Sequence, residues 1–157
     1  MTEPNAAPVH IATLASLAGR VGEVLATSPW VTIDQQRIDL FAQATGDHQW
    51  IHVDRERAAQ GPFGTTIAHG FLTLSLLPEL ANAAMVVDDV RMGINYGLNR
   101  VRFPSPVPVD SRLRGVLRLI AYDPLPGGAQ LTMEVTMERE GADKPACVAE
   151  SVSRRFT

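Results

Sequence analysis

An apolar segment followed by a long alternating pattern limits the possible folds more than any other feature of this chain. Residues 71–86 are hydrophobic on nearly every side of a helical wheel, so a helix formed there must be buried on most faces, and Pro78 removes one backbone donor and could bend it. From about residue 92 the period changes to two, most clearly where Leu131, Met133 and Val135 alternate with polar residues. One buried helix followed by an antiparallel meander predicts an α+β fold, with the sheet wrapped on the helix.

The first third of the chain has weaker signals. We expect residues 1–12 to be a loose lead-in, followed by a short helical turn over residues 14–18. Residues 24–31 are typical of a strand that Pro29 interrupts. The whole chain contains no internal repeat and no linker long enough to divide domains, so we expect one domain over residues 1–157.

A second helix is predicted from its end signals. Asp34 is a suitable N-cap, apolar residues recur at helical spacing after it, and Gly46 follows Thr45 where a C-terminal glycine is expected. The residues just after Gly46 should therefore lie in a loop. Residues 145–156 are expected to close the chain as a final strand.

Composition excludes several classes of protein. A net charge of −3 and 20% charged residues argue against nucleic-acid binding, which normally needs a basic face. The single cysteine, Cys147, cannot form a disulfide within the chain, which suits a reducing compartment. Residues 1–8 lack the basic and apolar regions of a secretory signal, and the polar residues within 70–87 would be poorly tolerated in lipid. We predict a cytoplasmic protein without a membrane span.

The residues suited to chemistry lie between the second helix and the apolar segment. Asp47 and His52 put a carboxylate and an imidazole five positions apart, and His69-Gly70 opens the apolar segment. Imidazole titrates near neutral pH, and a carboxylate can be tuned towards it, so such a pair can share general acid–base work. An acid, a base and a helix start that face one pocket would make a water-handling site.

These residues also carry a family resemblance. Gly46-Asp47 through His52, with Ala58 six residues on, resembles the hydratase motif of MaoC-like, (R)-specific enoyl-CoA hydratases, Gly-Asp-x-Asn-Pro-aliphatic-His. Gln49 replaces the usual Asn and Trp50 the usual Pro, a variant similar to the subgroup of nodulation protein N. The similarity continues through residues 62–72 and 96–104.

The resemblance implies a fold and a reaction. It implies a hot-dog fold, in which the sheet wraps the long helix and two copies pair edge to edge as a homodimer. It implies reversible hydration of trans-2-enoyl-CoA to (3R)-3-hydroxyacyl-CoA, with Asp47 and His52 holding one water and the Gly70 N–H binding the thioester oxygen. Coenzyme A is then part of the substrate, and no metal or separate cofactor is expected.

Four further residues are candidates for substrate binding. Gln49 could replace the family asparagine as a ligand of water or a carbonyl, or point away. Trp50 could cover an acyl tunnel, although a packed aromatic is the simpler interpretation. His69 could orient the helix start, and Ser75 could reach the pocket or bond to the backbone of its own helix.

Several alternatives stay open at the level of sequence. His48 and His52, four apart beside Asp47, could bind a metal only on a continuous helix, which Gly46 and Trp50 disfavour. Which of Asp47 and His52 removes the first proton is open, as are acyl chain length and the choice between coenzyme A and a carrier protein. A hot-dog thioesterase and a non-catalytic acyl-CoA-binding module are the alternative functions.

Overall fold

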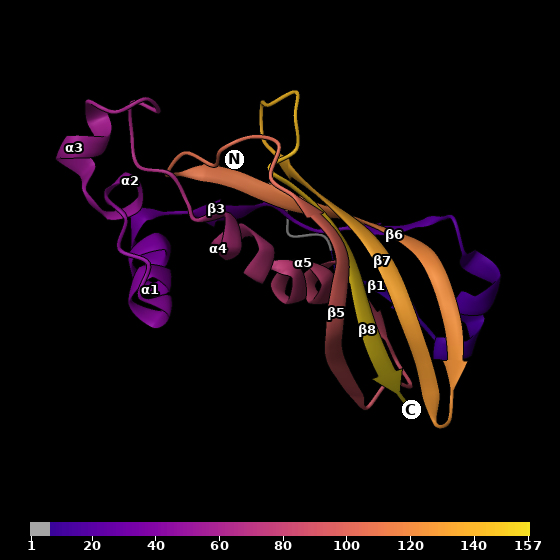
Figure 1. Ribbon diagram of the computed structural model, residues 1–157. Helices are drawn as coiled ribbons and strands as arrows, with labels where there is room; N and C mark the ends of the chain where they lie inside the picture. The colour runs from indigo at the N-terminus through magenta and orange to yellow at the C-terminus, as the bar shows by residue number, and fades with distance from the viewer. Residues whose placement is uncertain (1–6) are drawn as a thin grey trace.

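A curved antiparallel sheet holds two consecutive helices against its concave face (Figure 1). The computed structural model describes residues 7–157. The strands are β1 (Val9–Ile11), β2 (Val24–Thr27), β3 (Val31–Ile33), β4 (Met85–Val87), β5 (Met92–Arg102), β6 (Ser111–Leu125), β7 (Gly128–Arg139) and β8 (Cys147–Phe156). The helices are α1 (Gln35–Thr45), α2 (Trp50–Val53), α3 (Arg55–Ala59), α4 (Gly70–Ser75) and α5 (Leu77–Ala84), with a 3-10 helix η1 (Leu14–Arg20).

The main sheet has the order β2-β6-β7-β8-β5, and β3 pairs with β6 further along the edge that β2 occupies. The predicted strand with an interruption at Pro29 is therefore two short strands on one partner. The three long antiparallel strands β6, β7 and β8 form the centre of the sheet. The expected α+β hot-dog architecture, a sheet wrapped around a central helical segment, is confirmed.

The two faces of the sheet follow the alternation in the sequence. Leu117 on β6 lies opposite Val135 on β7, and both are buried against the helices. Leu80 of α5 is fully buried and packs so closely over Gly115 of β6 that an added Cβ would lie 3.3 Å from the Leu80 Cβ. On the convex face, arginines of β6 pair with glutamates of or just after β7: Arg112–Glu140, Arg114–Glu138 and Arg118–Glu134. Such exposed pairs help to fix the register but contribute little stability.

The apolar segment predicted as a helix over residues 71–86 forms two consecutive helices, α4 and α5, with the bend that Pro78 was expected to cause. It bends at Leu76, whose N–H bonds to the Thr73 carbonyl three residues back, before Leu80 bonds to Leu76 and α5 continues. Pro78 explains the break, because it has no N–H to donate to the carbonyl four residues before it. The helical part ends at Ala84, and Met85–Val87 form strand β4 instead.

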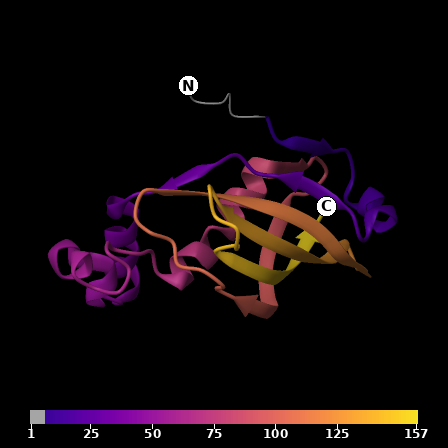
Figure 2. The same ribbon diagram turned by 90° about the horizontal axis from the view of Figure 1, so that it is seen from above.

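The prediction of a loose lead-in is wrong for residues 9–11. They form β1, which pairs in parallel with β4 in the register Val9 to Met85. Residues 1–6 of the predicted lead-in lie outside the described residues. Figure 2 shows β1 at the margin of the molecule. Its partner lies 76 residues away, so no local pattern could have indicated it.

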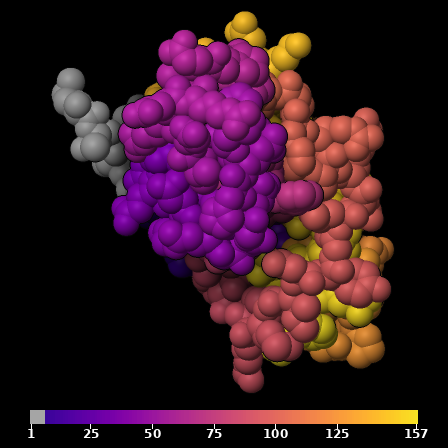
Figure 3. Space-filling view, turned by 60° about the vertical axis from the view of Figure 1, so that its left-hand side comes forward, coloured from indigo at the N-terminus to yellow at the C-terminus, as the bar shows by residue number. Residues whose placement is uncertain are grey.

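Helix α1 begins and ends as predicted. The Asp34 side chain accepts a hydrogen bond from the Arg37 N–H, and Gly46 ends the helix with a left-handed φ of 79°. Together with α2 and α3 it forms a lobe beyond one end of the sheet, which stands forward in Figure 3. Among the residues that the structure describes, no helix is long and apolar enough to cross a membrane.

Candidate active site

Asp47 lies in the loop that Gly46 turns away from α1. Its side chain is exposed, and its Oδ1 accepts a hydrogen bond from the Gln49 N–H at 3.3 Å. This local bond orients the carboxylate within the loop, but it leaves the second carboxylate oxygen available.

His52 is buried, with 6% of its surface exposed. It was expected in the same loop, but it lies in the one-turn helix α2. Its Nδ1 is 2.7 Å from the Ile67 carbonyl oxygen. Because a carbonyl can only accept, Nδ1 must carry the proton in the neutral ring, which leaves Nε2 with a free lone pair.

A buried network holds the backbone of His52. The side-chain amide of Gln35 on α1 donates to the His52 carbonyl oxygen at 2.8 Å, and also to Asp39. The Thr66 hydroxyl in turn donates to the Gln35 Oε1. Gln35 and Thr66 are both buried, so these bonds are shielded from water and fix α2 against α1. Sequence reasoning missed Gln35 and Thr66, because the bonds join residues 17 and 31 positions apart.

His69 connects the Asp47 loop to the start of α4. Its Nε2 donates to the Asp47 backbone carbonyl at 2.9 Å, and its ring stacks on that of His52 with centroids 3.8 Å apart. The ring of Phe41 covers it from a centroid distance of 5.0 Å. His69 is 2% exposed, and its Nδ1 has no hydrogen-bond partner among the described residues. His69 thus contacts both the Asp47 loop and the His52 ring.

The side chains of Asp47, His52 and His69 converge. One carboxylate oxygen of Asp47 and one ring nitrogen of each histidine lie within 4.8 Å of one another. Burial lowers the pKa of His52 below its ordinary value, and the nearby His69 adds to this effect. The bond to Ile67 and the charge of Asp47 act in the opposite direction without cancelling it. A lowered pKa favours the neutral form of His52, the form that a general base requires.

The same three side chains could be considered as metal ligands. The lone pairs of imidazole nitrogens lie in the ring planes, and the planes of His52 and His69 are stacked at an angle of only 23°. An ion bound to both rings would therefore lie well outside at least one of the two ring planes, an unfavourable geometry for imidazole ligands. His48, the metal ligand considered with His52 from the sequence, is exposed and is not part of the cluster.

Gly70 begins α4, directly after His69. No side chain caps this helix, and the first N–H groups of a helix have no acceptor within it. A Cβ on Gly70 would lie 3.2 Å from the ring of Phe103, so the close packing at this position is suited to glycine. The helix start therefore presents backbone donors next to the cluster of Asp47, His52 and His69.

The other three candidates lie outside this cluster. Gln49 is exposed at the start of α2. Trp50 packs under the guanidinium of Arg57, 4.4 Å from its ring centroid, and against Gly61. Ser75 is also exposed and donates to the Phe71 carbonyl at 2.6 Å, the backbone bond that was one of its two interpretations.

The chain is similar in sequence and in structure to MaoC-like proteins. Residues 16–143 match the sequence model of the MaoC-like domain. The chain is 58% identical over 143 residues to 3-hydroxyacyl-thioester dehydratase Z of Mycobacterium tuberculosis, covering 90% of this chain and 95% of that protein. It is 50% identical over 146 residues to nodulation protein N of Rhizobium leguminosarum, covering 90% and 89%. An unliganded (R)-hydratase from Pseudomonas aeruginosa superposes with a TM-score of 0.67 at 25% identity, covering 87% and 81%.

Proposed function

The chain belongs to the MaoC-like dehydratase family, and on that premise we propose that it interconverts trans-2-enoyl thioesters and (3R)-3-hydroxyacyl thioesters. The observation that carries this proposal is the state of His52. Its proton is held on Nδ1 by the Ile67 carbonyl, and the basic Nε2 belongs to a ring that lies beside Asp47. A carboxylate and a neutral imidazole in that arrangement can hold one water molecule.

Hydration needs three events, and the site has a group for each. Water loses a proton as its oxygen attacks the β-carbon, and a proton reaches the α-carbon. Asp47 and His52 exchange these protons with the shared water. The hydroxyl group and the hydrogen are therefore added to the same face of the double bond. Negative charge that builds on the thioester oxygen is stabilised by the N–H of Gly70 at the start of α4, a preorganised donor.

The relatives support this reaction. The M. tuberculosis relative is named a 3-hydroxyacyl-thioester dehydratase, and the structural neighbour from P. aeruginosa is an (R)-hydratase. Dehydration and hydration are the two directions of one equilibrium. A metal-free site is part of the proposal, because the stacked histidines suit a shared water better than a shared ion.

The test is a hydration assay with crotonyl-CoA and a medium-chain enoyl-CoA. We expect loss of the enoyl absorbance and a product that only a (3R)-specific dehydrogenase oxidises. Release of free coenzyme A thiol is measured in the same samples. Release of the thiol without hydration would show that the protein is a thioesterase. Binding of the substrates without any turnover would show that it is a non-catalytic acyl-CoA-binding module.

The pH dependence of the reaction should follow His52. The proposed base must be unprotonated, so kcat/KM should fall as the pH falls through the His52 pKa, which lies below 6.5. Replacing Asp47 by Asn removes a charge that raises this pKa, and should therefore lower it further. Histidine NMR titration of both proteins measures the pKa without requiring turnover. A His52 pKa above 6.5 in the unsubstituted protein would contradict the assignment.

We further propose that the protein is a homodimer paired through β5. This strand is an edge of the sheet, and ten of its eleven residues are exposed. Apolar side chains are among them: Met92, Ile94, Tyr96 and Leu98. A long apolar edge invites pairing with another chain, and two copies of β5 related by a twofold axis would join both sheets. β5 lies open along one side of the molecule in Figure 3.

Two matched substitutions test the dimer. Leu98 on β5 and Val24 on the short strand β2 are similarly exposed, at 44% and 46%. Leu98→Glu should give monomers in analytical ultracentrifugation, because the charge would be buried in the interface. Val24→Glu should leave the dimer intact. A dimer that survives Leu98→Glu would exclude β5 as the interface.

A further inference from the structure

The inward-facing positions of β8 carry unusually small side chains. Ser151 and Ser153 lie opposite Met133 and Leu131 of β7, which face the same side of the sheet. Ala149 precedes them in the same row. Because these short side chains do not reach α5, a cavity of about 270 Å³ remains between the helix and β8. Leu77 and Ala81 of α5 form part of its apolar wall.

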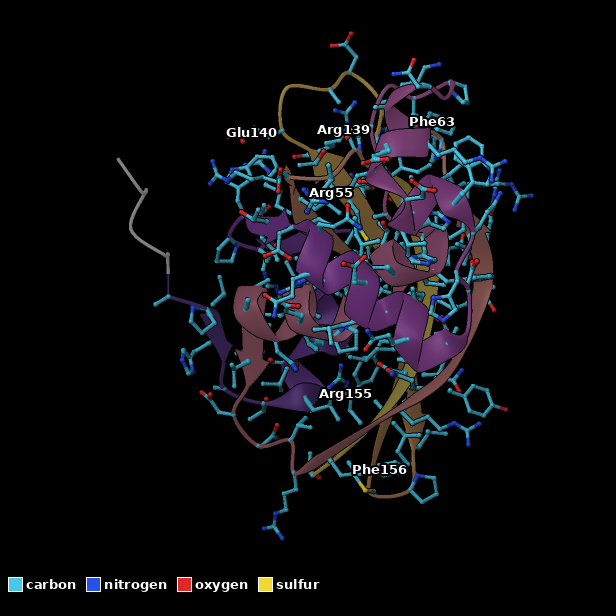
Figure 4. All side chains as sticks on the ribbon, turned by 90° about the vertical axis from the view of Figure 1, so that its left-hand side faces the viewer. Arg55, Phe63, Arg139, Glu140, Arg155 and Phe156 are labelled. Carbon is cyan, nitrogen blue, oxygen red and sulfur yellow. The ribbon has the colours of Figure 1, made fainter. Side chains whose placement is uncertain are left out.

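The next inward-facing residue of β8, Arg155, places a positively charged side chain at this cavity. Arg155 lines it, and its guanidinium lies over Gly93 of β5, where an added Cβ would be 2.6 Å from Nη1. Gly93 therefore leaves the space that the guanidinium occupies. Burial lowers the pKa of Arg155, which shows that the surroundings do not favour its charge. Figure 4 labels Arg155 at the end of the molecule away from the loop with Phe63.

Arg155 has no carboxylate partner among the described residues, unlike the arginines on the convex face of the sheet. Its side chain forms one hydrogen bond among the described residues, from Nε to the Ser153 hydroxyl at 3.3 Å, and no carboxylate there pairs with it. By contrast, Arg112 and Arg114 on the convex face each have a glutamate. A partly buried guanidinium without an anion is costly, and a bound carboxylate would offset that cost.

The cavity lies further along the helical segment that starts at Gly70. At about 1.5 Å per residue, the path along that segment from Gly70 is about 10.5 Å to Leu77 and about 16.5 Å to Ala81, and the bend at Leu76 makes the straight distances shorter. An acyl chain whose thioester oxygen is bound at Gly70 could therefore extend along α4 to the cavity. The amides of Asn82 and Asn95 and the hydroxyl of Ser151 also line the cavity, so its wall has polar groups beside the apolar ones.

We propose that the cavity receives the far end of the acyl chain, and that Arg155 binds a carboxylate carried there. The substrate class is thus a monothioester of an α,β-unsaturated dicarboxylic acid. This inference rests on the proposed hydration and adds the chemistry of the substrate's other end. A chain that ends in a methyl group would leave the partly buried guanidinium without an anion.

The test compares two enoyl-CoA substrates of equal length, one ending in a methyl group and one in a carboxylate. The unsubstituted protein should have at least about a tenfold higher kcat/KM for the carboxylate, because removing one partner of such a pair is costly. Arg155→Met should abolish or reverse this preference. Arg154→Met is the matched control: Arg154 lies over Tyr96 and bonds to Gln130, outside the cavity lining, and its replacement should leave the preference unchanged.

Binding of the two saturated acyl-CoA analogues, measured by calorimetry, separates this inference from the proposed reaction. Tighter binding of the carboxylate analogue, lost in Arg155→Met, supports the cavity assignment even if neither enoyl substrate is hydrated. Equal affinities, or a preference that survives Arg155→Met, would overturn it even if hydration is fast. The last sample contains the methyl-ended analogue together with free dicarboxylic acid. If the methyl-ended analogue then binds as tightly as the analogue with the linked carboxylate, the cavity assignment would also be overturned.

Discussion

Replacing Asp47 by Asn or His52 by Asn should lower kcat for enoyl-CoA hydration by about 10²- to 10⁴-fold, the usual contribution of a general acid or base. Asp47→Asn keeps the shape of the side chain and removes its charge. His52→Asn keeps an N–H close to the position of Nδ1, so the bond to the Ile67 carbonyl can persist while the basic Nε2 is lost. Initial rates with crotonyl-CoA measure both effects, and circular dichroism checks that both variants fold.

The double variant tests whether the two residues share one water. If they act as a unit, removing both should cost little more than the more damaging single substitution. Independent roles would instead multiply the two losses. His48→Gln is the control within the same segment, because His48 is exposed and outside the cluster. A folded His52→Asn protein with near-normal kcat would show that His52 is not the base.

The parts of the fold that follow from neighbouring residues could be predicted. Helix α1 has its cap at Asp34 and its terminating glycine at Gly46, and both signals lie within one turn of the helix ends. The inward and outward faces of β7 follow from strict alternation of apolar and polar residues. The bend at Leu76 was expected from the sequence, since Pro78 must remove one helical hydrogen bond.

Parts that depend on distant pairing could not be predicted. The pairing of β1 with β4 joins segments 76 residues apart, and three residues carry too little pattern to indicate it. The small side chains of β8 were present in the sequence. Their consequence, a cavity with Arg155 at its wall, appears only once α5 is placed over that strand.

In the candidate site, too, the residues could be predicted from local sequence but their long-range contacts could not. Asp47 and His52 could be named because they are five positions apart and match a family motif. The stacking of His69 on His52, and its bond to the Asp47 carbonyl, require the start of α4 to lie against α2. Sequence reasoning offered His69 as a substrate-binding candidate or as a residue that orients the helix start. In the structure His69 instead contacts the Asp47 carbonyl and the His52 ring.

Gly70→Pro should lower kcat by about 10²- to 10³-fold, because it removes the N–H proposed to bind the thioester oxygen. Gly70 is the first residue of α4, the helical position at which proline is best tolerated. The preceding residue, His69, has φ −59° and ψ 138°, a conformation that a residue before proline readily adopts. The substitution should therefore remove one donor and leave the helix and the His52–His69 stack in place.

Gly70→Ala is the matched control for this experiment. It adds the same Cβ, which must displace the ring of Phe103 from 3.2 Å, but it keeps the N–H. Phe103 is 42% exposed and can move, so Gly70→Ala should lose far less activity than Gly70→Pro. Equal losses in the two variants would attribute the effect to crowding and not to the donor. If Gly70→Pro folds and retains full kcat, the thioester oxygen must be stabilised by another group, and the N–H groups of Phe71 and Leu72 in the same first turn would be the next to examine.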